Sequence, residues 1–215
     1  MFQFINDYIT NWPKLHQLFS DIAESHIQEA QLVEAQNARA EEQARKMFNK
    51  ESYDSQTMHD LSMQQGGART SREIGAGSIF VVLNTMLDEL KKDLQISEDK
   101  FCKSGPLFAS QSFGAVVRAA SNNFRHMEEW RAQLAAKKPY TKQQLNSIEV
   151  LAPVLGFEQK DYGLLADNVC PQVLDVLGGN DFEELERHLF TFANKLAVGV
   201  ENNKNGVALT PAATV

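Results

Sequence analysis

Residues 113–130 read FGAVVRAASNNFRHMEEW and lie within a predicted amphipathic helix from about Gln111 to Ala136. At about 100° per residue, the apolar side chains of this segment gather on one side of the helix. This apolar stripe consists of Phe113, Val116, Val117, Ala120, Phe124, Met127 and Leu134. An amphipathic helix of this kind buries its apolar stripe against other helices. The segment therefore predicts a helical bundle.

The remaining segments also favour helices. Pro13 suits the first turn of a helix, and the pattern predicts a long helix over 13–49. A polar stretch with a break at Gly66-Gly67 follows, and Ser71 then caps a predicted helix over 71–95. Thr141 and Gln144 stand in the spacing of a capping box. The later helices are expected over about 141–155, 161–169 and 171–177, with a last one ending near Val200.

We find no convincing strand and no repeat, so the sequence predicts an all-α fold, a helical bundle in a single domain of residues 1–201. Its core is expected in 71–201. The tail 202–215 lacks apolar periodicity and is predicted to be flexible. After Val33 the apolar positions of the N-terminal helix thin out, and Glu34–Lys46 is rich in Ala, Glu, Gln and Arg. Such a segment forms a helix with little core to face, so we expect it to project or to pair with another chain.

Net charge and hydrophobic content limit the classes of function that this chain is expected to have. The 215 residues carry a net charge of −7, with a sequence pI near 5.3. This balance argues against a generally basic nucleic-acid-binding surface, although a local basic patch stays open because net charge does not determine local potential. Hydrophobic residues make up 43% of the chain, which is enough to build a core at this length.

Metal, cofactor and membrane signals are weak. Cys102 and Cys170 are isolated, and the histidines show no HxxxH or HExxH spacing, so we expect neither a metal nor a cofactor. The N-terminus has no signal-peptide pattern, and no apolar run approaches the roughly 20 residues of a membrane span. We therefore expect a cytoplasmic protein with buried thiols.

The polar side of the 111–136 helix has the character of a binding site. Arg118, Asn122, Arg125 and Glu129 gather opposite the apolar stripe, and Asn123, His126 and Trp130 follow one flank. Arg offers a fork of donors that matches phosphate oxygens, and His transfers protons near neutral pH. This combination suits phosphate chemistry, including metal-free RNA cleavage, which needs a base, an acid and cations.

At these residues, from about Ser71 to Trp130, the chain resembles the HEPN superfamily. That family carries an Arg, a short polar run and then a His on a late helix of an all-α bundle. The run Asn-Asn-Phe-Arg-His-x-x-Glu-Trp at 122–130 is similar to one found in HEPN-like proteins. Arg118 precedes His126 with one more intervening residue than the family pattern has, and Arg125 is adjacent to His126.

The resemblance implies a dimeric, metal-independent ribonuclease of a toxin–antitoxin or phage-defence system, or at least a protein that binds RNA or nucleotide phosphate. The implied catalytic residues are His126 for proton transfer, with Arg118 and Arg125 holding phosphate. Asn122 and Asn123 are implied to orient the substrate or the His, and Glu129 to hold an Arg.

Two other interpretations stay open. In the first, the polar face is only solvated structure, in which Arg125 and Glu129 form an i, i+4 ion pair and His126 bonds a neighbouring helix. In the second, the protein is a non-catalytic interaction or scaffold protein, and its long N-terminal helix packs on a protein partner or on a second copy. The acidic net charge favours this second alternative.

Overall fold

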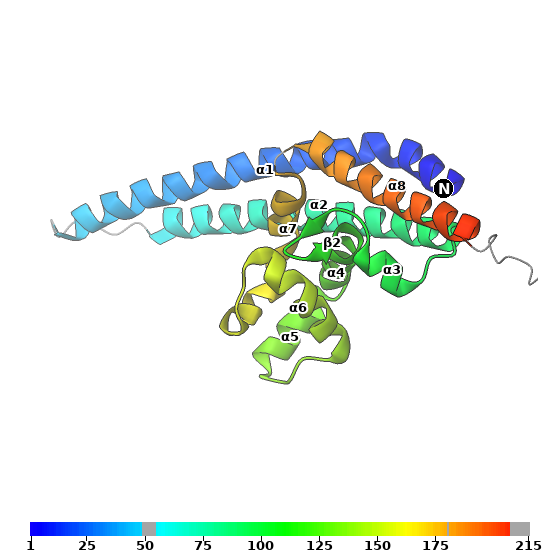
Figure 1. Ribbon diagram of the computed structural model, residues 1–215. Helices are drawn as coiled ribbons and strands as arrows, with labels where there is room; N and C mark the ends of the chain where they lie inside the picture. Colours follow the sequence, from blue (N-terminus) through cyan, green and yellow to red (C-terminus); the bar gives the residue numbers. More distant parts are fainter. Residues whose placement is uncertain (49–54, 180, 207–215) are drawn as a thin grey trace, which may run out of the picture.

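The computed structural model describes residues 1–48, 55–179 and 181–206, with side chains described up to residue 199, and this part of the chain is almost entirely helical (Figure 1). The all-α class and the long N-terminal helix are confirmed. The elements in chain order are α1 (Phe2–Phe48), α2 (Ser55–Asp93), α3 (Glu98–Lys103), β1 (Leu107–Phe108), β2 (Gln111–Ser112), α4 (Phe113–Arg125), α5 (Met127–Ala135), α6 (Lys142–Leu155), the 3-10 helix η1 (Gln159–Ala166), α7 (Val169–Gly178) and α8 (Phe182–Gly206).

The two longest helices, α1 and α2, run antiparallel side by side as a hairpin (Figure 1). The half of this hairpin near the N-terminus carries α8 and the rest of the bundle, whereas the other half extends away from it. We call this second half, residues 27–48 of α1 and 55–67 of α2, the arm. Within these two ranges only Gln43 is buried. The arm therefore has almost no core of its own.

The first helix begins at Phe2, not at Pro13 as predicted, and Pro13 lies inside it. An internal proline removes a backbone hydrogen bond and costs about 3 kcal/mol, so other contacts must hold the turns before it. Aromatic side chains of these turns pack on α8: Tyr8 meets Phe190 edge-on at 4.8 Å between ring centroids, and Trp12 meets Phe182 at 4.6 Å. Tertiary packing, rather than local propensity, extends the helix.

The second helix was expected to begin at Ser71, but it begins at Ser55 and continues through Gly66-Gly67. Two glycines lower helix propensity by about 1 kcal/mol each. The neighbouring α1 offsets this cost by contact along the hairpin, including an ion pair at 2.6 Å between Arg72 and Glu29. The predicted break is thus absent, although residues 49–54, which include the predicted end of the first helix at Asn49, lie outside the described residues.

The core sits where α4 crosses α2 and contacts α6, α7 and α8. The N-terminal part of the predicted α4 stripe, Phe113, Val116, Val117 and Ala120, is fully buried. Phe124 is partly buried and lies so close to Gly77 of α2 that a Cβ built there would stand 2.1 Å from its ring. Gly77 therefore permits the close approach of the two helices.

Two smaller differences concern strands and the C-terminus. A two-residue antiparallel pairing of β1 with β2 turns through Ala109 and Ser110, both with positive φ, where no strand was expected. The last helix reaches Gly206 instead of ending near Val200, so the predicted tail is helical over 202–206, and 207–215 lie outside the described residues. The capping box of Thr141 and Gln144 is present at the start of α6, as predicted.

Candidate functional site

The predicted helix over 111–136 is broken at His126. Residues 111–112 belong to β2, and Ser112 caps α4 by accepting a hydrogen bond from the Ala115 amide at 3.2 Å. His126 has φ −113° and ψ 17°, which ends α4 and starts α5. Arg118, Asn122 and Arg125 consequently share α4, whereas Glu129 lies on α5. The predicted four-residue polar face is therefore divided between two helices.

A groove separates α4 and α5 from α6. Its larger part has a volume of about 250 Å³ and is lined by Glu98, Cys102, Arg118 and Asn122, with side chains of α6 opposite. A smaller hollow beside it is lined by Asn122, His126, Glu129, Trp130 and the start of α6. Both parts share Asn122, Gln143 and Ser147, so they form one continuous groove. We call it the α4–α6 groove.

The structure thus brings Arg118 and His126 to the two parts of one groove, with Asn122 between them. The polar α6 residues of this groove, Gln143, Asn146 and Ser147, were not selected from the sequence. Their spacing places them on one side of α6, with Val150 one turn further along the same side. This spacing is the sequence feature from which a polar face of α6 could have been predicted. The groove lining is richer in amides and hydroxyls than in cations.

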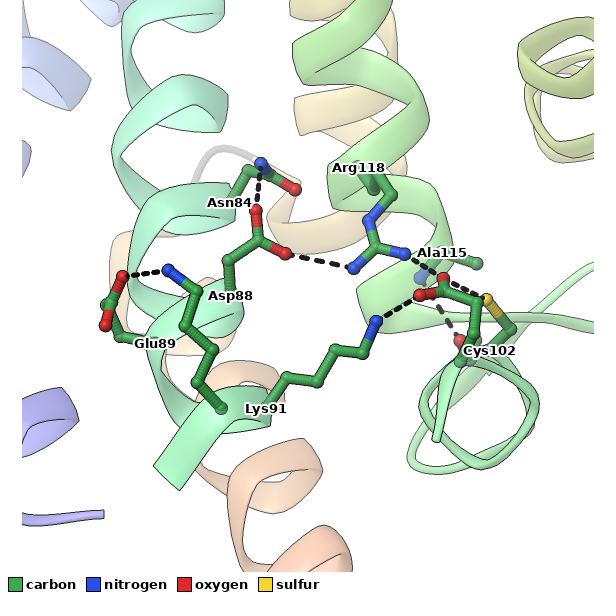
Figure 2. A network of polar contacts seen from close by, with 10 residues as sticks. Asn84, Asp88, Glu89, Lys91, Cys102, Ala115 and Arg118 are labelled. Carbon is green, nitrogen blue, oxygen red and sulfur yellow. Dashed lines mark hydrogen bonds and ion pairs between the residues drawn. The ribbon is translucent and has the colours of Figure 1, made fainter. Parts of the chain in front are cut away.

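Arg118 is held by carboxylates from two other elements (Figure 2). Its Nη2 atom lies 3.0 Å from Oδ1 of Asp88 on α2, and its Nη1 atom donates to Glu98 on α3. Its guanidinium also lies over the ring of Phe101, 4.5 Å from the centroid. The side chain is only 23% exposed. Because two carboxylates neutralise this Arg, it would have to leave them to hold a phosphate.

The same network controls the ionisation of Glu98 and Cys102. Burial opposes ionisation of Glu98, but hydrogen bonds from Lys91 and Cys102 and the charge of Arg118 outweigh it and lower the pKa of the carboxyl. Burial, together with the hydrogen bond to Glu98, raises the pKa of the Cys102 thiol. Cys102 is therefore kept as a neutral donor and is not an activated nucleophile.

Glu129 was expected to hold an Arg, but it pairs with His126, whose Nδ1 atom lies 3.1 Å from its Oε1 atom. The i, i+4 ion pair between Arg125 and Glu129 is absent, and the two residues lie on different helices. Arg125 is exposed and has no hydrogen bond or ion pair within the described residues. His126 lines this part of the groove, whereas Arg125 is not among its lining residues.

Asn123 takes a packing role. It is 1% exposed, and its Nδ2 atom donates to the carbonyl oxygen of Leu165 at 2.8 Å, which ties α4 to η1. A substrate in the groove would not meet this amide. Trp130 is likewise buried, 6.2 Å from the ring of Tyr140. Of the two asparagines predicted to bind substrate, only Asn122 lines the groove.

A second polar cluster lies in the core between α2 and α7. Glu73 is 4% exposed, and its Oε1 atom accepts a hydrogen bond from the backbone amide of Cys170 at 3.5 Å. Its other oxygen has no partner within the described residues. Burial raises the pKa of Glu73 above its ordinary value of 4.5. The cluster is closed to solvent, so it does not form part of a substrate-binding surface.

No family model, curated protein or solved structure matches this chain at a significant level. The resemblance to the HEPN superfamily therefore stays a prediction. Among the residues described, no helix is both long enough and apolar enough to cross a membrane.

Proposed function

We propose that this protein is a helical interaction protein whose projecting arm binds another protein. The observation that carries the proposal is the exposure of the arm, in which Gln43 alone is buried across 27–48 and 55–67. Helices in proteins take most of their stability from packing of an apolar face, and this arm presents large apolar side chains to solvent. They include Ile27 at 59%, Met47 at 64% and Met63 at 65% exposure.

Two further features support this proposal. The net charge of −7 suits a protein partner better than a nucleic acid. The α4–α6 groove offers mainly neutral amides and hydroxyls, with its most buried cation already paired to Asp88 and Glu98. An exposed apolar surface on an extended element is the usual mark of an interaction site.

Photo-crosslinking in cells tests the proposal. A photoreactive amino acid placed at Val33 or Met63 on the arm should give discrete crosslinked products. The matched control is Leu145 on α6, which is similarly apolar and 45% exposed but lies in the bundle. Equal products from arm and control positions, or none from the arm, would reject the arm as the interaction site.

A second candidate function is binding of RNA or nucleotide phosphate at the α4–α6 groove, with metal-independent cleavage as in the HEPN-like interpretation. The observation that favours it is His126, which lines the groove next to Asn122 and directly follows the exposed Arg125. Here Arg125 would contact phosphate and His126 would transfer the proton. Binding of a labelled single-stranded RNA to wild type and to Arg125→Ala tests it: the variant should bind less tightly and with a smaller salt dependence.

A further inference from the structure

One face of α1 in the arm has the pattern of a coiled-coil seam on which no other described element packs. We define the seam as Ala30, Val33, Asn37, Ala40, Ala44 and Met47. These positions alternate in steps of three and four residues, which is the spacing of the a and d positions of a heptad, with Ala30 at a and Val33 at d. All six side chains are exposed.

The seam continues a face of α1 that already binds a helix in the bundle. Trp12 and Phe19, seven residues apart, both contact Phe182 at the start of α8, with ring centroids 4.6 Å and 5.4 Å away. Val33, Ala40 and Met47 extend the same column in steps of seven. Since α8 runs back from Phe182 towards the N-terminal turns of α1, where Phe190 meets Tyr8, it leaves this part of the column bare. The side chains of Val33, Ala40 and Met47 are therefore accessible to a further helix.

Charge indicates which helix fits. Glu34 directly follows Val33, and Glu41 directly follows Ala40. Both glutamates are exposed along the same flank of the seam. The basic residues Arg39 and Lys46 lie elsewhere on the helix, where both pair with Glu42. Two antiparallel copies of the seam would set these acidic residues against each other, and two parallel copies would set them against the flank that carries Gln36 and Gln43, so neither arrangement offers them an opposite charge. A helix with Lys or Arg on its flanks would instead form attractive pairs.

We propose that the seam binds an amphipathic helix of a partner protein, with small or aliphatic residues on its apolar stripe and Lys or Arg beside that stripe. This inference rests on the proposed function of the arm. Asn37, the one polar residue of the seam, occupies an a position and would set the register of the pair. The small side chains at Ala40 and Ala44 let the partner backbone approach closely, as a narrow seam requires.

The test uses the full-length protein and two synthetic helical peptides with the same Ala- and Leu-based a/d stripe. One peptide carries Lys and the other Glu at the flanking positions. The Lys peptide should bind roughly tenfold more tightly than the Glu peptide, as measured by fluorescence anisotropy at low salt. The double variant Glu34→Lys, Glu41→Lys should reverse that preference, whereas Glu149→Lys on the exposed face of α6 should not. Val33→Glu should abolish binding, with Leu145→Glu as its control and circular dichroism confirming helicity.

Failure of this inference is distinguishable from failure of the arm as an interaction site. Equal affinity for the two peptides, no binding of the Lys peptide, or insensitivity to Val33→Glu would overturn the seam. Crosslinks from Met63 but not from Val33 would leave the arm as the interaction site and move the contact to α2. A dimer in sedimentation that Val33→Glu dissociates would assign the seam to a second copy and refute a basic partner helix.

Discussion

The Nδ1 atom of His126 lies 3.1 Å from the Oε1 atom of Glu129, across the junction where α4 ends and α5 begins. The His side chain is 36% exposed, and that of Glu129 is 74% exposed. A solvent-exposed pair of this kind adds little to folding stability. His126 is therefore accessible for chemistry, and loss of its side chain should not open a cavity in the core.

His126→Ala consequently separates the candidate functions. We expect it to change the melting temperature by less than about 2 °C, because the side chain fills no core space. If the α4–α6 groove cleaves RNA, the same change should abolish cleavage, since it removes the proton-transfer group. Both quantities are measured on one preparation, by thermal unfolding and by cleavage of labelled RNA.

Wild-type protein that neither binds nor cleaves RNA would rule out the HEPN-type nuclease interpretation. A fall of several degrees in melting temperature on His126→Ala would instead show that the residue serves structure.

Arg118→Ala should lower the free energy of unfolding by about 1–3 kcal/mol. The change leaves Asp88 and Glu98 without their shared cation and removes the guanidinium from the ring of Phe101. Urea unfolding measures the effect. Arg187→Ala is the matched control, because Arg187 pairs with Glu184 at the surface with its side chain 68% exposed. Equal effects of the two substitutions would mean that the Arg118 network contributes no more than a surface ion pair.

Glu73 should make stability fall as the pH rises. Burial raises its pKa in the folded protein, so the native state holds this proton more tightly than the unfolded chain. The contribution of the protonated carboxyl is fully present below the unfolded pKa and is lost as the pH rises through the folded pKa. Glu73→Gln cannot ionise, so the unfolding free energy of the variant relative to wild type should increase with pH above about 4.5.

Urea unfolding of both proteins from about pH 4 to pH 8 checks this sign. Glu149→Gln, at an exposed position of α6, controls for the loss of one negative charge. A difference between Glu73→Gln and wild type that stays constant with pH would contradict the argument.

Gly77→Ala should destabilise the protein by about 1–3 kcal/mol, because its new methyl group would overlap the ring of Phe124 at 2.1 Å. Gly67→Ala, in the same helix, meets nothing within 4 Å and should stabilise by up to about 1 kcal/mol through helix propensity. Thermal unfolding of the two variants gives the comparison. A stabilising Gly77→Ala would contradict this close packing of α2 against α4.

The local features of this protein follow from short sequence patterns. The apolar spacing of Phe113, Val116, Val117 and Ala120 predicted the buried side of α4, and Thr141 with Gln144 predicted the start of α6. These features depend on side chains within one or two helical turns, so a local pattern contains all the information that they need. The polar character of Arg118, Asn122 and Arg125 on one helix was predictable for the same reason.

The points at which helices continue, and the polar side chains that stay available, depend on contacts between distant parts of the chain. Pro13 and Gly66-Gly67 lie inside helices because aromatic contacts with α8 and the length of the α1–α2 hairpin outweigh local propensity. Asn123 donates a hydrogen bond to the carbonyl oxygen of Leu165, which is 42 residues away in the sequence. Arg118 donates one to Asp88, which is 30 residues away. Periodicity shows which side of a helix is polar. Because a buried polar group must find its partner wherever the fold places one, only the packed chain shows which of these groups remain free to bind a ligand.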